Sequence, residues 1–226
     1  HIPYSPIIKT TYVDKQNNLW IKSQRSFIKM FFPPSPYTYR ELGNYFDTKS
    51  FLFDSDEHLW IATKKGIIRI MDSRKNLLGY LSPDGELAQT ETVFAEGGIY
   101  VMLKDQAQTI WLGSKENGLF RLVPRNRPYH YEVYHYMNNP SDPYSISDNK
   151  ISCIDEDHNG RIWIGTYGGG LNLVEEKEDG AIRFIHAENN LSGFPINRTN
   201  SIRCMVEGPG HTMLVGTIEA VSYTHL

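Results

Sequence analysis

The sequence predicts an all-β protein built from one repeated unit, and three observations support this. All four tryptophans, Trp20, Trp60, Trp111 and Trp163, fall at one repeat position, at intervals of 40, 51 and 52 residues. The residues that follow the tryptophan repeat as well, as in Ile164-Gly165-Thr166. Each unit also consists of short runs of β-branched, aromatic and aliphatic residues separated by turn residues, and no helical period interrupts them.

The repeat has five copies in chain order. They are Val13–Ile21 (VDKQNNLWI), Phe53–Ile61 (FDSDEHLWI), Lys104–Leu112 (KDQAQTIWL), Ile154–Ile164 (IDEDHNGRIWI) and Val206–Val215 (VEGPGHTMLV). The fifth copy has Leu214 in the tryptophan position. Such self-similarity is typical of proteins built from stacked supersecondary units.

The fourth unit shows the expected strands most clearly. The strand candidates are Ile151–Ile154, Arg161–Thr166, Gly170–Val174 and Ala181–His186. Asn159-Gly160 and Asp179-Gly180 separate two of the pairs, and both dipeptides favour two-residue hairpins. Four strands in a repeat of about 50 residues predict the blade of a β-propeller. We expect the tryptophan to pack between neighbouring blades.

Composition excludes several classes. The net charge of −3 argues against nucleic-acid binding, which needs clustered Lys and Arg. No apolar run approaches the roughly 18 residues of a membrane span. Cys153 and Cys204 are too few for a disulfide framework or a zinc cluster, so we expect two small buried residues at equivalent positions of neighbouring blades.

Residues Asp157 to Leu171, DHNGRIWIGTYGGGL, resemble the two-component regulator propeller repeat. The preceding segment, Asn139–Ile154, is similar to the lead-in of such blades, and Asn190–Met205 is a degraded version of it. The resemblance covers most of residues 10–217 and is weakest in the first and fifth units. Lys22-Ser23 replaces Gly-Thr in the first unit.

The resemblance implies seven-bladed propellers, often in tandem, on the periplasmic side of a homodimeric inner-membrane sensor. A β-sandwich domain, a membrane helix and a histidine kinase follow in that family, and many members respond to oligosaccharides and control polysaccharide-utilisation genes. Four to five four-stranded blades cannot close a ring of seven, so we expect residues 1–217 to form an incomplete propeller. Residues 218–226, which end in VSYTHL, look like a non-native tail.

Propeller ligands usually bind on the face that carries the loops between second and third strands. The candidate ligand-binding residues in these loops are Arg25, Lys64, Lys115, Asn117 and Tyr167. Their mixture of cationic, amide and aromatic side chains suits a polar or acidic oligosaccharide. Solvated loop charges are the alternative for each of them. We predict no catalytic residue, metal ligand or cofactor, because the eight histidines lack metal-ligand spacing and catalytic motifs are absent.

Several alternatives stay open at this point. Asp155–Gly160 begins like a calcium loop, but lacks the final glutamate, and a hairpin turn is the other interpretation. Gly168–Gly170 is either a tight strand connection or a phosphate loop without its lysine. Tyr129–Tyr136 is either an aromatic sugar platform or an outer strand. The rival functions are a carbohydrate-active propeller enzyme and a protein-interaction propeller.

Overall fold

The computed structural model describes residues 8–15, 18–23, 27–30, 38–40, 47–191, 200–218 and 221–225, and their regular structure is all β. None of these residues forms a helix long and apolar enough to span a membrane. The chain divides into two compact units, His1–Asp47 and Thr48–Leu226. Each unit is described by itself.

The first unit contains one antiparallel sheet in the order β1-β2-β3-β4. Its strands are β1 (Ile8–Val13), β2 (Leu19–Ser23), β3 (Phe27–Met30) and β4 (Thr38–Arg40). Trp20 lies on β2 opposite Tyr12 of β1. The sheet therefore has the strand order of one complete blade.

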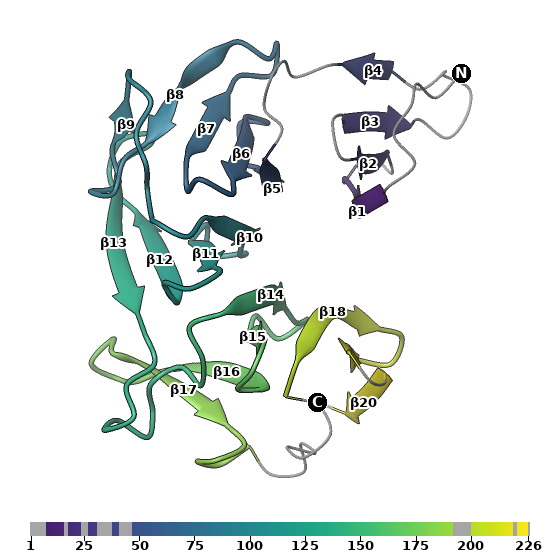
Figure 1. Ribbon diagram of the computed structural model, residues 1–226, viewed down its shortest axis with the longest axis vertical. Helices are drawn as coiled ribbons and strands as arrows, with labels where there is room; N and C mark the ends of the chain where they lie inside the picture. Colours follow the sequence, from purple (N-terminus) through teal and green to yellow (C-terminus); the bar gives the residue numbers. More distant parts are fainter. Residues whose placement is uncertain are drawn as a thin grey trace. The chain divides into compact units, whose positions relative to one another are not determined.

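The second unit contains four antiparallel sheets, each with its strands in chain order (Figure 1). The first two sheets consist of β5 (Thr48–Phe53), β6 (Leu59–Thr63), β7 (Ile68–Met71), β8 (Leu77–Leu81) and β9 (Leu87–Ala88), and of β10 (Ile99–Lys104), β11 (Ile110–Ser114), β12 (Leu119–Pro124) and β13 (Tyr131–Tyr136). The last two consist of β14 (Ile151–Glu156), β15 (Ile162–Thr166), β16 (Leu171–Glu176) and β17 (Ile182–His186), and of β18 (Ile202–Gly208), β19 (Thr212–Thr217) and β20 (Val221–His225).

The first strands of these sheets contact one another in sequence, β5 with β10, β10 with β14 and β14 with β18. This is the arrangement of propeller blades around an axis, and it confirms the prediction of an incomplete all-β propeller. The segment 218–226 contributes β20, which pairs with β19 as the third strand of its blade. The expectation that this segment is a non-native tail stays a prediction from sequence.

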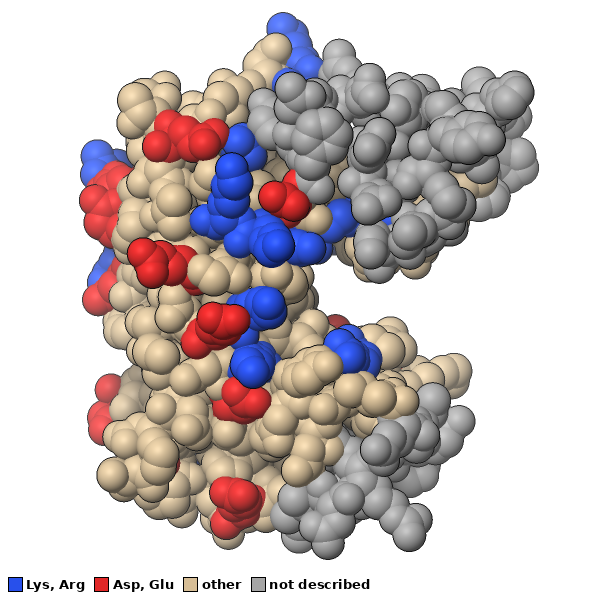
Figure 2. Space-filling view, in the orientation of Figure 1, with Lys and Arg blue, Asp and Glu red and all other residues tan. Residues whose placement is uncertain are grey.

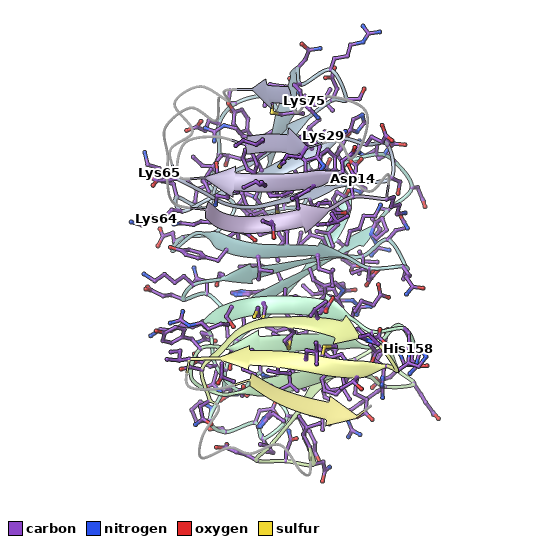
Figure 3. All side chains as sticks on the ribbon, turned by 90° about the vertical axis from the view of Figure 1, so that its right-hand side faces the viewer. Asp14, Lys29, Lys64, Lys65, Lys75 and His158 are labelled. Atoms are coloured by element: carbon purple, nitrogen blue, oxygen red, sulfur yellow. The ribbon has the colours of Figure 1, made fainter. Side chains whose placement is uncertain are left out.

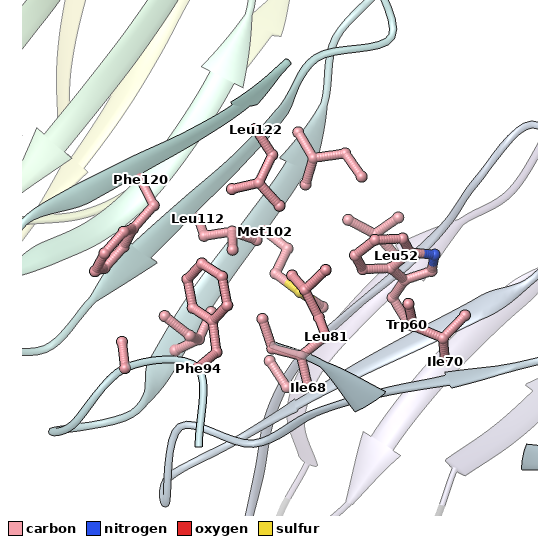
Figure 4. Close-up of a cluster of buried hydrophobic side chains, with 14 residues drawn as sticks. Leu52, Trp60, Ile68, Ile70, Leu81, Phe94, Met102, Leu112, Phe120 and Leu122 are labelled. Carbon is pink, nitrogen blue, oxygen red and sulfur yellow. The ribbon is translucent and has the colours of Figure 1, made fainter. Parts of the chain in front are cut away.

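The hydrophobic core lies between blades. One cluster joins Trp60, Ile68 and Leu81 of the β5–β9 sheet to Leu112 and Leu122 of the next sheet, all nearly inaccessible to solvent (Figure 4). Two further clusters fill the next two blade interfaces around Trp111 and Trp163. The prediction that the repeated tryptophan packs between blades is therefore confirmed for the second unit.

An aspartate at one repeat position fixes the tryptophan of its own copy. In each of the first four copies of the repeat, the aspartate six residues before the tryptophan accepts a hydrogen bond from the indole Nε1, at 2.8–3.0 Å. Its other oxygen accepts from the backbone amide four residues ahead. The pairs are Asp14–Trp20, Asp54–Trp60, Asp105–Trp111 and Asp157–Trp163. In the fifth copy of the repeat both partners are missing, since Gly208 replaces the aspartate and Leu214 replaces the tryptophan.

The structure decides three of the open alternatives. Asp157 uses its carboxylate on the Trp163 indole, on Arg161 and on the amide of Asn159, so the segment is a hairpin turn between β14 and β15. Tyr129–Tyr136 contributes the outer strand β13, and Tyr131 packs edge-on against Trp60 with ring centroids 5.8 Å apart. Gly168–Gly170 forms the tight connection between β15 and β16.

One expectation about the cysteines is wrong. Cys153 is partly buried, but Cys204 is exposed, and both are free thiols. Cys153 packs against a cluster that includes Ile202 of the next blade. No described strand of the second unit covers β18 in the same way, so Cys204 at the equivalent position faces solvent.

Candidate functional site

The predicted ligand-binding residues of the second unit lie on one face. Lys64 follows β6, Lys115 and Asn117 follow β11, and Tyr167 follows β15. All four therefore lie where second strands turn into third strands. Figure 3 shows Lys64 on this side of the sheets and His158, in a turn between first and second strands, on the opposite side. Arg25 lies outside the described residues.

A hydroxyl at the end of each second strand shapes these loops. Thr63 Oγ1 accepts from the Ile67 amide at 3.1 Å, Ser114 Oγ from the Asn117 amide at 2.6 Å and Thr166 Oγ1 from the Gly169 amide at 3.0 Å. Each hydroxyl also donates to a carbonyl four residues ahead. The threonine or serine that follows the tryptophan segment thus closes the loop and fixes the residues between.

The loops are also tied to the segment that leads into the next blade. Gly118 and Gly170 donate their amides to the carbonyls of Asn149 and Asn200, at 2.9 and 3.0 Å. Tyr167 donates its amide to the Lys150 carbonyl at 2.9 Å. The Asn117 side chain ties its loop to the segment that leads into its own blade, since its Nδ2 donates to the Glu96 carbonyl at 2.9 Å. The backbone of this face is therefore held in place while Lys64, Lys115 and Tyr167 stay exposed.

A second set of residues on this face was not predicted. The first strand of each blade has a register irregularity near its start, and the bulged residues in the second unit are Lys49, Tyr100, Ser152 and Arg203. Bulges commonly redirect side chains at functional sites. The sequence signal was available, because these residues occupy one repeat position, eleven residues before the tryptophan or its replacement.

Three of the four bulged residues take part in cation–aromatic pairs that bridge neighbouring blades. The Arg203 guanidinium of β18 lies 4.4 Å from the centre of the Tyr167 ring and donates to its hydroxyl at 3.0 Å. The Lys49 ammonium of β5 lies 5.2 Å from the centre of the Tyr100 ring of β10. Tyr167 and Arg203 are exposed, so both groups are accessible to a ligand.

The charge of this face is mixed. Figure 2 shows Lys and Arg gathered toward its inner side, with Asp and Glu among them. The exposed basic residues of the loops and strand starts are Lys64, Lys65, Lys115, Lys150 and Arg203. Lys115 is 4.0 Å from Glu116, a distance at which an exposed pair contributes little. The cations are thus largely available to an anionic or hydroxyl-rich ligand.

Comparison with known proteins identifies one repeat within the chain. The model of the two component regulator propeller matches residues 145–168, which run from the lead-in of the β14–β17 blade to the loop after β15. The chain carries a two-component regulator propeller repeat. The matched segment contains both the Asp157–Trp163 pair and Tyr167 of the candidate site, so the regulator propeller repeat itself builds part of this face.

One curated relative is a histidine kinase. A histidine kinase of Formosa agariphila is 26% identical over 139 residues, which cover 57% of this chain and 9% of the kinase. The chain thus spans less than a tenth of the length of that relative.

Solved structures share the fold. The extracellular domain of a hybrid two component system of B. thetaiotaomicron has a TM-score of 0.69 at 19% identity, over 96% of this chain and 27% of that domain. A second such domain from the same organism has a TM-score of 0.64 at 16% identity, over 97% of this chain and 31% of that domain. A virginiamycin B lyase of Staphylococcus aureus has a TM-score of 0.61 at 12% identity, over 96% of this chain and 69% of the lyase chain. At these identities the likeness shows the propeller fold alone.

Proposed function

We propose that this chain is a segment of the periplasmic sensor propeller of a two-component regulator, and that it binds an oligosaccharide on the face formed by the loops after β6, β11 and β15. The parent protein would be a homodimeric inner-membrane histidine kinase with further propeller blades and a β-sandwich domain. Its signal would control polysaccharide-utilisation genes. The segment itself binds rather than catalyses, and it contacts no nucleic acid.

The Tyr167–Arg203 pair carries the proposal. A tyrosine face stacks on the apolar face of a sugar ring, and an arginine binds carboxylates or vicinal hydroxyls with two parallel hydrogen bonds. Here the two groups lie 4.4 Å apart on a hydrogen-bonded backbone, so little conformational entropy is lost when a ligand binds. Lys64, Lys65 and Lys115 on neighbouring loops supply positive charge, which favours a ligand with uronic acid or sulfate groups.

The blade interfaces suggest how binding is transmitted. Tyr167 belongs to the β14–β17 blade and Arg203 to the β18–β20 blade. A ligand that engages both residues stabilises one spacing of the two blades over others. It shifts the equilibrium of the parent sensor only by the difference in its affinity for the two states. Such a difference of about 1.4 kcal/mol changes the population ratio tenfold.

Binding can be tested by isothermal titration calorimetry with matched neutral and uronic-acid oligosaccharides. We expect the acidic member of a pair to bind more tightly and the difference to shrink at high salt, because exposed charges are screened. Tyr167→Ala and Arg203→Gln should each weaken binding at least tenfold, about 1.4 kcal/mol.

Arg183→Gln is the matched control. Arg183 also lies over a tyrosine ring, that of Tyr144, at 5.1 Å, but it is on the outer strand β17 and away from the loop face. This variant should bind like the unmodified chain. Equal loss in Arg183→Gln and Arg203→Gln would contradict the assignment of the face. Absence of binding to all neutral and acidic oligosaccharides would reject oligosaccharide recognition by this segment, and release of a cleaved product would favour the enzyme alternative.

A further inference from the structure

Three side chains converge at the end of the blades opposite the candidate ligand-binding face. His158 lies in the turn between β14 and β15, Glu207 on β18 and His211 in the turn between β18 and β19. Glu207 Oε1 is 2.6 Å from His158 Nδ1 and 2.9 Å from His211 Nδ1. The two imidazole rings are stacked with their centroids 3.6 Å apart. One nitrogen of each ring and one carboxylate oxygen thus face a common point.

The fold holds the carboxylate in this position. Glu207 Oε2 accepts a hydrogen bond from the backbone amide of His158 at 2.7 Å. The preceding blade has the same contact one repeat earlier, where Glu156 Oε2 accepts from the amide of Gln106 at 2.9 Å. The contact between the turn of one blade and the first strand of the next is therefore a property of the repeat, and it leaves Oε1 of Glu207 available to a ligand.

The histidines are what distinguishes this copy. His158 stands where the preceding blade has Gln106, and His211 stands where the β14–β15 turn has Gly160. His211 adopts the left-handed backbone conformation, with φ of 59°, which a glycine at that position adopts at lower cost. The sequence did not reveal the cluster, because 49 residues separate His158 from Glu207.

We infer that His158, Glu207 and His211 form a binding site for one divalent transition-metal ion of the Zn²⁺ class. Their ligand atoms all lie within 4.8 Å of one another, which suits ligation of one ion at about 2.0–2.2 Å from each atom. Two imidazoles and one carboxylate are a borderline set that favours Zn²⁺, Ni²⁺ or Cu²⁺ over Ca²⁺ and Mg²⁺. Water completes the coordination. The ion cross-links the β14–β17 and β18–β20 blades at the end opposite the ligand-binding face.

A second group with similar chemistry, Asp54, Asp56 and His58, does not meet the same test. The carboxylate oxygens of Asp54 accept hydrogen bonds from the Trp60 indole and from the amides of Asp56 and His58. His58 Nδ1 contacts the Tyr129 hydroxyl. These atoms belong to the repeat's own turn, whereas Glu207 Oε1 contacts the side chains of the two histidines in the described part of the chain.

The test is titration of the whole chain with ZnCl₂ at pH 7.5. We expect one high-affinity Zn²⁺ per chain by calorimetry. Substitution of Co²⁺ should give the visible absorption of a nitrogen- and oxygen-ligated ion. His158→Ala, His211→Ala and Glu207→Gln should each lower the affinity at least tenfold.

Two control variants separate the site from other effects. Glu156→Gln changes the equivalent carboxylate one blade earlier, which accepts from the amide of Gln106 where Glu207 accepts from the amide of His158. His58→Ala removes the histidine of the second cluster. Both should bind Zn²⁺ like the unmodified chain. Glu207→Gln keeps an oxygen that accepts from the His158 amide, so it preserves the fold while removing the charged ligand. Unchanged affinity in His158→Ala and His211→Ala would overturn the inference, and so would loss in His58→Ala alone.

Discussion

Cys153 and Cys204 occupy the same repeat position, and their environments differ because of what lies beyond each strand. Cys153 faces Gly165 across the hairpin, and Cys204 faces Gly216 in the same register. Burial raises the pKa of the Cys153 thiol to about 12, whereas Cys204 is exposed. Cys153 and Cys204 therefore share one local geometry and differ in burial.

We predict that a thiol reagent labels one cysteine of the native chain, Cys204. The thiolate is the reactive species, so a pKa of about 12 keeps Cys153 protonated between pH 7 and 9, and burial excludes the reagent. Labelling followed by peptide mass spectrometry checks this. In denaturant both thiols should react, and the native Cys204→Ser variant should react slowly. Equal labelling of the two cysteines in the native chain would contradict the burial of Cys153.

At the scale of the element, the aspartate–tryptophan pair links the turn of a hairpin to its second strand. Asp157 is 1% exposed and accepts from Trp163 Nε1 at 2.8 Å, Arg161 Nε at 2.7 Å and the Arg161 amide at 3.0 Å. Burial of this carboxylate acts to raise its pKa, and the hydrogen bonds outweigh it, so the pKa is lowered from 3.8. The pair therefore depends on an ionised aspartate.

We predict that Asp157→Ala lowers the free energy of unfolding by about 3 kcal/mol at pH 7, because it leaves the buried indole and amide donors without an acceptor. Since the folded pKa is below the unfolded one, this stabilisation is present above pH 4 and is lost as the pH falls through the folded pKa. Urea denaturation at neutral and acidic pH measures both effects.

Asp72→Ala is the control for Asp157→Ala. Asp72 accepts from the Asn76 amide and side chain in the exposed β7–β8 turn, at 2.7 and 2.9 Å, and no indole depends on it. Its loss of stability should be clearly smaller. If the two variants lose the same stability, the aspartate acts through its turn and not through the tryptophan.

At the scale of the whole molecule, the repeat made the fold predictable. Trp60, Trp111 and Trp163 mark the blades of the second unit, and their period predicted the sheets and the interfaces between them. The loop face followed from the same period. The Tyr167–Arg203 pair and the His158–Glu207–His211 cluster did not, because each joins residues of two different blades more than 30 residues apart. Their proximity depends on the spacing of blades, which no local pattern specifies.

The glycine after the tryptophan segment sets that spacing. A Cβ on Gly165 would lie 2.5 Å from Cys153 Sγ and 2.6 Å from Ile202 Cγ2 of the next blade. In the same way, a Cβ on Gly113 would lie 2.5 Å from Ile151 Cγ2 of the next blade. A Cβ on Gly216 would lie 2.6 Å from Cys204 Sγ, and no described residue of another blade would lie within 4 Å of it. Ala62 occupies the equivalent position opposite Ser50, a small residue, and its methyl group is accommodated there.

We therefore predict different costs for one substitution at two equivalent glycines. Gly165→Val forces the β18–β20 blade away from β15 and should lower the free energy of unfolding by about 1–3 kcal/mol. Gly216→Val meets only the exposed Cys204 side chain, which can change rotamer, and should cost less than about 1 kcal/mol. Because the cross-strand partner is a cysteine in both cases, the difference measures the contribution of the next blade. Equal costs in urea denaturation would show that strain lies within the hairpin and that blade spacing is set elsewhere.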